Sequence, residues 1–276
     1  MKRYIALLSM ICLVAACNKD VTAPELPEVG KISYVFSSSA IINAVAGSSS
    51  GAMVLVDSRD TTYTANPTIE YSQYPYLYRV DNASIPVYPR LNSIWTKFTN
   101  LNKGKHQLLL ADTSGFGKRR ILDSMQVDIN PDAPTIVYYG DSCGNFSHIV
   151  AADKYLVDTA KVGVRIINLS PFTGPVYMTL NKQVPVSFPA STKYKDNTGF
   201  LSLPVSGPTT FNIKLYSVSN TSSYIATGSM SVTPGHAYTL VIYGYSNNNP
   251  GSYIDPTTGR TVSITPNLTI LTTNNY

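Results

Sequence analysis

Side chains that could do acid–base, nucleophilic or metal chemistry are few and scattered in this 276-residue chain. The three histidines, His106, His148 and His236, have no acidic residue or cysteine at the spacing of a zinc-ligand set. Cys143 lies in no Cys-x-x-Cys pair, so we interpret it as a packed thiol. The sequence therefore predicts no catalytic residue, no metal site and no cofactor, and a protein that is not an enzyme.

A run of tyrosines offers the densest set of groups for binding a ligand. Tyr74, Tyr76 and Tyr78 have a spacing of two, so an extended segment would present all three rings on one face. Exposed tyrosines stack on sugar rings and donate hydrogen bonds. We predict that this segment, together with Trp95, forms a ligand or partner surface. The alternative is that the rings cover a sheet edge or line a contact between domains.

Three hydroxyl groups could carry a covalent glycan. Thr61, Ser124 and Thr159 each follow an aspartate in a short pattern that resembles the O-glycosylation acceptor motif of Bacteroidota. We expect Thr61 and Thr159 to lie in loops.

The first residues have the pattern of a secretory signal peptide. Lys2 and Arg3 precede an apolar stretch at 4–14, which is too short to span the roughly 30 Å hydrocarbon core of a bilayer. The sequence from Leu13 to Cys17 resembles the lipobox of bacterial lipoproteins, in which the cysteine thiol receives diacylglycerol through a thioether. We predict that residues 1–16 are removed and that a lipid on Cys17 anchors the protein to the membrane.

A polar, proline-containing segment follows at 17–30 and is typical of a tether. Lys19 and Asp20 resemble the surface-export signal of some Bacteroidota lipoproteins, so we expect the outer membrane, with the protein facing either the periplasm or the cell surface. Loss of residues 1–16 leaves 19 basic and 16 acidic residues, a formal charge of +3. This small charge predicts no nucleic-acid partner.

The elements that must position these groups have the patterns of short β-strands. Apolar residues alternate at Leu108 and Leu110, and again at Phe211, Ile213 and Leu215, as in half-buried strands. Continuous apolar runs at 137–139 and 240–243 are typical of central strands. No segment sustains an amphipathic helix over three turns. The sequence predicts an all-β chain.

The chain also resembles itself. In order along the sequence, 41–44 match 166–169, 135–140 match 239–244, and 144–155 match 266–276. We predict two tandem immunoglobulin-like β-sandwich domains, at 31–157 with a Tyr-rich insertion and at 158–276.

The second copy opens with Arg-x-x-Asn-x-Ser-Pro at 165–171 and later has Pro-Val-Ser-Gly at 204–207 and Pro-Gly-His-Ala-Tyr at 234–238. This series resembles the bacterial family called domain of unknown function 4397. The first copy lacks the arginine and the Ser-Pro. The resemblance implies an extracytoplasmic β-sandwich with no established activity.

We therefore expect a non-enzymatic cell-envelope lipoprotein that acts as a binding or structural module. Two alternatives stay open: a surface glycan-binding protein of a polysaccharide-uptake system, suggested by the Tyr-rich segment, and an adhesin or assembly subunit that pairs through exposed sheet edges. In either case the partners are the membrane, a glycan or another envelope protein.

Overall fold

The computed structural model describes residues 27–38, 40, 52–57, 87–88, 98–112, 120–255 and 259–275, and these are β-rich throughout. In the first half, one sheet has the strand order β3-β1-β7-β8, with β4 also pairing with β1, and a second sheet has the order β2-β5-β6. The strands are β1 (Val29–Phe36), β2 (Ala52–Val56), β3 (Val87–Tyr88), β4 (Thr99–Asn102), β5 (Gly104–Asp112), β6 (Arg120–Ile129), β7 (Thr135–Ser142) and β8 (Asn145–Ala152).

The second half has the same arrangement, with sheets ordered β11-β9-β14-β17 and β10-β12-β13 and a separate β15-β16 hairpin. The strands are β9 (Lys161–Leu169), β10 (Val176–Leu180), β11 (Asn197–Pro204), β12 (Thr209–Ser217), β13 (Asn220–Val232), β14 (Ala237–Tyr243), β15 (Ser252–Ile254), β16 (Thr261–Ser263) and β17 (Thr269–Asn274). Within the described residues, no helix has the length and apolar character needed to cross a membrane.

The two halves share one topology. In each, the first strand runs parallel to a central strand: β1 beside β7, and β9 beside β14. That central strand pairs on its other side with an antiparallel strand, β8 or β17. The second sheet is a three-stranded antiparallel unit in both cases. The predicted all-β fold of two tandem β-sandwiches is confirmed.

Each sandwich encloses its own apolar core, built from the residues that alternate inward along facing strands. In the first, Phe36 on β1 and Tyr139 on β7 stack with ring centroids 5.4 Å apart, opposite Leu108 and Leu110 on β5. In the second, the predicted alternation on β12 places Ile213 and Leu215 inward, against Leu240 on β14. Burial of such side chains contributes roughly 1.5–3 kcal/mol each.

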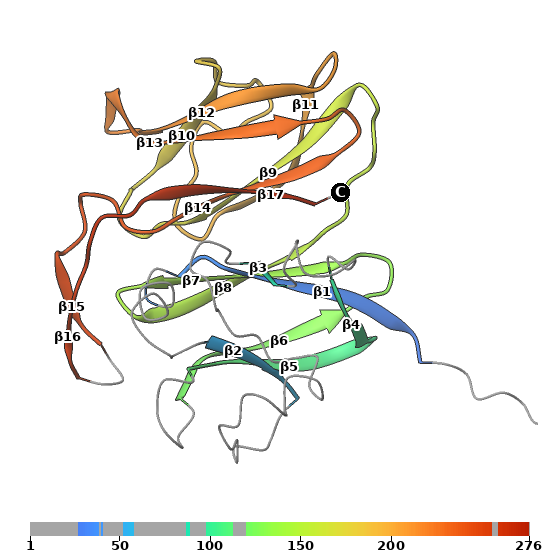
Figure 1. Ribbon diagram of the computed structural model, residues 1–276, viewed down its shortest axis with the longest axis vertical. Coiled ribbons are helices and arrows are strands. Elements are labelled where there is room, and N and C mark those ends of the chain that lie inside the picture. Colours follow the sequence, from blue (N-terminus) through green and yellow to red (C-terminus); the bar gives the residue numbers. More distant parts are fainter. Residues whose placement is uncertain are drawn as a thin grey trace, which may run out of the picture.

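A third apolar cluster lies between the two sandwiches, where the β1-β7-β8 sheet packs against the β9-β14-β17 sheet. It joins Val35, Ile136 and Tyr138 from the first half to Ile167, Leu169 and Val241 from the second. The four large sheets are therefore stacked in four layers (Figure 1). Both central strands are covered on both faces, which explains why their sequences are continuously apolar.

Gly140 on β7 permits the two inner sheets to approach each other closely. A Cβ at this position would lie 3.1 Å from the Cβ of Leu169 on β9. That separation is below ordinary van der Waals contact, so a larger residue would push the layers apart.

Arg165 on β9 is the polar centre of the contact between sandwiches and is only 1% exposed. Its guanidinium donates to the Tyr138 hydroxyl at 2.8 Å and to the Ala152 carbonyl at 2.9 Å, both in the first half. The Asp153 carboxylate lies 3.4 Å away and accepts a hydrogen bond from Asn275 at 2.6 Å. The charge is thus paired and bonded, as a buried charge must be.

The structure changes the residue alignment between the two halves. The strand that takes the place of β9 in the first half is β1, at Val29–Phe36, whereas residues 41–44, which the sequence matched to β9, lie outside the described residues. The alignment of 135–140 with 239–244 is shifted by one residue, so it matches side chains that point to opposite faces of their sheets. Tyr139 points into the first core, while its aligned partner Tyr243 packs in the layer between sandwiches.

Candidate ligand-binding cleft

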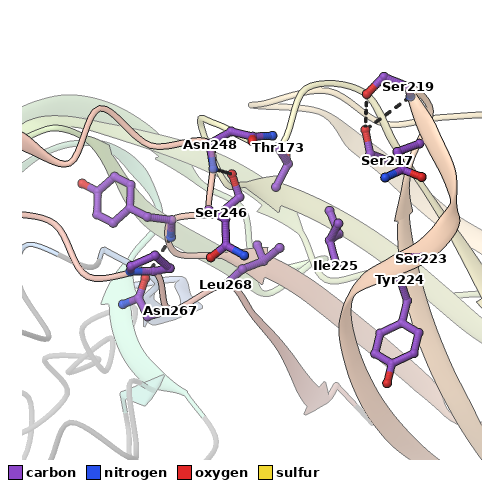
Figure 2. Close-up of a pocket in the computed structure, with 14 residues that line it drawn as sticks. Thr173, Ser217, Ser219, Ser223, Tyr224, Ile225, Ser246, Asn248, Asn267 and Leu268 are labelled. Carbon is purple, nitrogen blue, oxygen red and sulfur yellow. Dashed lines mark hydrogen bonds between the residues drawn. The ribbon is translucent and has the colours of Figure 1, made fainter.

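A cleft of about 540 Å³ opens at one end of the second sandwich. Four segments surround it: the β9–β10 turn, the β12–β13 hairpin, the chain after β14 and the chain before β17. Figure 2 shows Ile225 and Leu268 lying between the Ser217–Ser219 pair on one side and Ser246 and Asn248 on the other. The cleft therefore has a small apolar floor between two polar walls.

The chemical character of the cleft is neutral and rich in hydrogen-bonding groups. None of the described residues that line it is acidic, basic or a histidine. They carry hydroxyl groups, carboxamides and a few apolar side chains: Thr173, Ser217, Ser219, Asn220, Ser223, Tyr224, Ile225, Tyr245, Ser246, Asn247, Asn248, Pro266, Asn267 and Leu268. Such a lining can bind a polar, uncharged ligand but offers no acid, base or strong nucleophile for catalysis.

The Arg-x-x-Asn-x-Ser-Pro motif builds one wall. Asn168 is fully buried, and its side-chain oxygen accepts a hydrogen bond from the Ser170 amide at 3.0 Å. The Ser170 hydroxyl donates to the Gly244 carbonyl at 2.7 Å, and the Ser170 carbonyl accepts from the Thr173 hydroxyl at 3.3 Å. The motif thus ties the β9–β10 turn to the end of β14 and fixes Thr173 at the cleft.

Gly244 is required at the turn that leads from β14 into the cleft. Its φ of +88° is a conformation that side chains disfavour, and a Cβ there would lie 2.6 Å from the Asn267 carbonyl oxygen. The next residue, Tyr245, exchanges hydrogen bonds with Asn267: its amide donates to the Asn267 side chain at 2.8 Å, and its carbonyl accepts from the Asn267 amide at 2.9 Å. Glycine thereby allows the two chains of this wall to meet.

Local hydrogen bonds order both rims. The hydroxyls of Ser217 and Ser219 lie 2.8 Å apart at the β12–β13 hairpin. On the opposite rim, the Ser246 hydroxyl donates to the Phe172 carbonyl at 2.8 Å and accepts from the Asn248 amide at 3.3 Å. The cleft is therefore formed before any ligand binds, which lowers the entropic cost of binding.

Tyr245 connects the cleft to the first sandwich. Its ring stacks on Phe172 with centroids 5.7 Å apart. Its hydroxyl donates to the buried Asp141 carboxylate and accepts a hydrogen bond from the Cys143 amide at 3.1 Å. Burial, followed by the nearby Asp141 charge, raises the pKa of Tyr245 well above its ordinary value. The phenol thus stays neutral and acts as a structural link.

Three tyrosines outside the sequence-predicted set are neighbours across the β10-β12-β13 sheet, and one of them, Tyr224, lines the cleft. Tyr177 on β10 pairs with Tyr216 on β12, and Tyr216 pairs with Tyr224 on β13. The inward positions of β12 are Ile213 and Leu215, so Tyr216 points to the outer face of the sheet. The alternation of apolar residues along β12 could have shown that Tyr216 points outward. Only the strand register shows that the three tyrosines are neighbours.

The sequence-predicted residues fall into two groups. Those outside the described residues are Cys17, Thr61, Tyr74, Tyr76, Tyr78 and Trp95. Ser124 is exposed and lies within β6, where its hydroxyl accepts a hydrogen bond from Gln107 at 3.4 Å. Thr159 is exposed in the turn before β9. Neither described residue lines the cleft.

Two histidines form pairs with carboxylates away from the cleft. His106 Nδ1 lies 2.6 Å from Asp57, and its Nε2 lies 2.7 Å from the Asn102 carbonyl. His148 Nδ1 lies 2.7 Å from Asp123. The partly buried Cys143 has its pKa raised by burial and by the nearby Asp141 charge, which opposes thiolate formation.

No family model matches the chain, and no curated protein matches it. A solved structure described as alpha-glucan binding by a streptococcal virulence factor is similar to it with a TM-score of 0.24 and 10% sequence identity, over 80% of this chain and 97% of that one. At that TM-score the similarity supports no conclusion about function.

Proposed function

We propose that this protein is a non-enzymatic glycan-binding lipoprotein of the cell envelope, with its ligand site in the second sandwich. The observation that supports the proposal is the cleft of about 540 Å³ lined by hydroxyls, carboxamides and small apolar groups without a charged side chain. Neutral sugars present alternating hydroxyl and C–H surfaces, and this lining matches both. Its volume is within the range of small-molecule sites, roughly 300–1,000 Å³.

The same lining favours binding over turnover. Glycoside hydrolysis ordinarily requires two carboxyl groups on either side of the scissile bond, roughly 5–9.5 Å apart. The described residues around the cleft include no carboxyl group. The cleft residue Tyr245 does contact a carboxylate, that of Asp141. This carboxylate is buried and has a structural role, because it accepts hydrogen bonds from Ser38 and Tyr245.

The adhesin alternative receives less support from the second sandwich. Strand pairing with another chain needs an open sheet edge. At the β10 edge, Val176 bridges to Thr192 and Leu180 bridges to Gln183, so the chain that follows β10 covers part of this edge, whereas β13 is an edge strand paired on one side only.

A lipid on Cys17 is the part of the proposal that rests on sequence alone. We expect labelled palmitate to enter the wild-type protein, and Cys17→Ala to be released from the membrane fraction. Equal membrane retention of the variant, or absence of label in the wild type, would remove the anchor from the proposal.

Glycan binding is tested by affinity electrophoresis of the purified protein through gels containing starch, dextran, mannan or xylan, with polygalacturonate as an acidic comparison. We expect retardation by at least one neutral polysaccharide. Ser223→Trp should weaken that binding about tenfold or more, because the indole would fill the cleft.

Ser222→Trp is the matched control. Ser222 precedes Ser223 on β13, is exposed, and is not among the residues that line the cleft. Binding by this variant should equal that of the wild type. Retardation by polygalacturonate alone, or by none of the five polysaccharides, contradicts the proposal.

A further inference from the structure

We infer that the ligand is an extended polysaccharide chain that leaves the cleft and crosses the outer face of the β10-β12-β13 sheet over Tyr224, Tyr216 and Tyr177. This inference rests on the proposed function and specifies its ligand: an internal stretch of a neutral chain, longer than the cleft itself can hold.

Strand register places the three rings in one row. Tyr177 is the partner of Tyr216, which in turn is the partner of Tyr224. Since neighbouring strands lie about 4.8 Å apart, the row extends about 10 Å across the sheet. The Tyr177 and Tyr216 rings stack with centroids 5.3 Å apart and an interplanar angle of 13°. Tyr177 and Tyr216 thus form a stacked pair, and Tyr224 is the next residue across the sheet, beside an irregularity in the β12–β13 register.

Tyr224 joins this row to the cleft. It lines the cleft and also pairs with Tyr216, so a ligand that contacts Tyr224 can extend in either direction. Tyr224 is 53% exposed, so a ligand can reach it. Figure 2 shows the Tyr224 ring directed away from Ser219 and Ile225.

Lys214 holds the Tyr224 ring in place. Its ammonium lies 4.7 Å from the ring centroid, within the range of a cation–π contact. Lys214 and Tyr216 are two residues apart on β12 and so share the outer face. A restrained ring loses less freedom when a ligand stacks on it, so this contact favours binding.

A row of tyrosines suits a sugar chain better than a compact ligand. Aromatic rings bind the C–H faces of sugars, and their hydroxyls reach the sugar hydroxyls. A short oligosaccharide could fill the cleft alone, but only a longer chain would also cover Tyr216 and Tyr177. The arrangement therefore predicts that affinity depends on chain length.

The test uses whichever of starch, dextran, mannan and xylan is the polysaccharide that retards the protein most. The affinities of the trisaccharide and the octasaccharide of that polysaccharide are measured by titration calorimetry on the full protein. We expect the octasaccharide to bind the wild type about tenfold more tightly than the trisaccharide, and Tyr216→Ala to abolish that difference while leaving trisaccharide affinity unchanged.

Asn212→Ala is the matched control, because Asn212 is exposed on the same strand and face and bonds to Asn181 through its backbone alone. It should retain the full length dependence. Equal affinity for the two oligosaccharides, or an unchanged length dependence in Tyr216→Ala, overturns the inference while the cleft proposal stands. Failure of both oligosaccharides and of the polysaccharide to bind overturns the proposed function instead.

Discussion

The two outer faces of the second sandwich differ sharply in the residues that they present. The face formed by β9, β14 and β17 presents Ile167, Leu169 and Val241, all of which are at most 1% exposed against the first sandwich. The face formed by β10, β12 and β13 presents partly exposed tyrosines and Lys214. One face is committed to internal packing, and the other remains available to a ligand.

The comparison teaches how a basic residue is used in each environment. Arg165, on the covered face, makes hydrogen bonds to Thr239, Tyr138 and Ala152 and faces a buried carboxylate. Lys214, on the open face, contacts a tyrosine ring. Removing the first leaves a buried charge without its partner, whereas water can replace the contacts of the second.

The largest effect should come from Arg165→Met. Asp153 is fully buried, and loss of the guanidinium leaves its carboxylate without the opposing charge. We expect the free energy of unfolding to fall by about 3–5 kcal/mol, measured by urea denaturation. Lys214→Met, the same replacement on the open face, should change it by less than about 0.5 kcal/mol. Similar losses in the two variants would contradict the assignment of the two faces.

A smaller effect is expected for Tyr138→Phe. The Tyr138 hydroxyl accepts a hydrogen bond from Arg165 at 2.8 Å in a site without water access. Its removal leaves a buried donor with fewer partners and should cost about 1–3 kcal/mol of stability. Tyr216→Phe on the open face should cost almost nothing. If thermal unfolding showed the open-face variant to be the less stable one, the comparison would fail.

The smallest effect concerns the His106–Asp57 pair in the β2-β5-β6 sheet of the first sandwich, with His106 on β5 and Asp57 just after β2. Partial burial opposes protonation of His106, but its bonds to Asp57 and Asn102 raise its pKa above the ordinary 6.5 overall. Partial burial likewise opposes ionisation of Asp57, yet bonds to His106 and to the Gln107 amide lower its pKa below 3.8.

The raised histidine pKa gives stability that is full below about pH 6.5 and is lost as the pH rises through the folded value. The lowered aspartate pKa gives stability that is full above about pH 4 and is lost as the pH falls. Because Asp57 is half exposed, the pair should contribute about 0.2–1 kcal/mol between these limits. His106→Gln should therefore destabilise the protein at pH 5 and have less effect at pH 8.5. A pH-independent difference in melting temperature would refute the pair's contribution.

Much of the fold could be predicted from local patterns. Alternation at Phe211, Ile213 and Leu215 gave the correct inward face of β12, and continuous apolar runs correctly indicated central strands. The same runs do not show how β7 aligns with β14. A strand that is buried on both faces has no alternation of apolar and polar residues, so the sequence does not reveal a shift of one residue. This is why Tyr139 and Tyr243 were aligned although they face different layers.

The candidate site was beyond reach of the sequence for a different reason. Tyr177, Tyr216 and Tyr224 lie on three strands, and long-range pairing alone makes them neighbours. The Arg-x-x-Asn-x-Ser-Pro motif was visible, but its roles were not: Arg165 acts in the contact between sandwiches, and Asn168 and Ser170 shape the cleft wall. The spacing of residues in the sequence shows which side chains share a face of one strand, but it does not show which residues of different strands are neighbours.

Hydrogen–deuterium exchange of the full protein, with and without the neutral polysaccharide that binds it, tests the central claim most directly. We predict that the ligand slows amide exchange at 217–225, 244–248 and 266–268 and leaves β5 and β6 unchanged. Slower exchange confined to 71–95, or to the first sandwich as a whole, would contradict a site in the second.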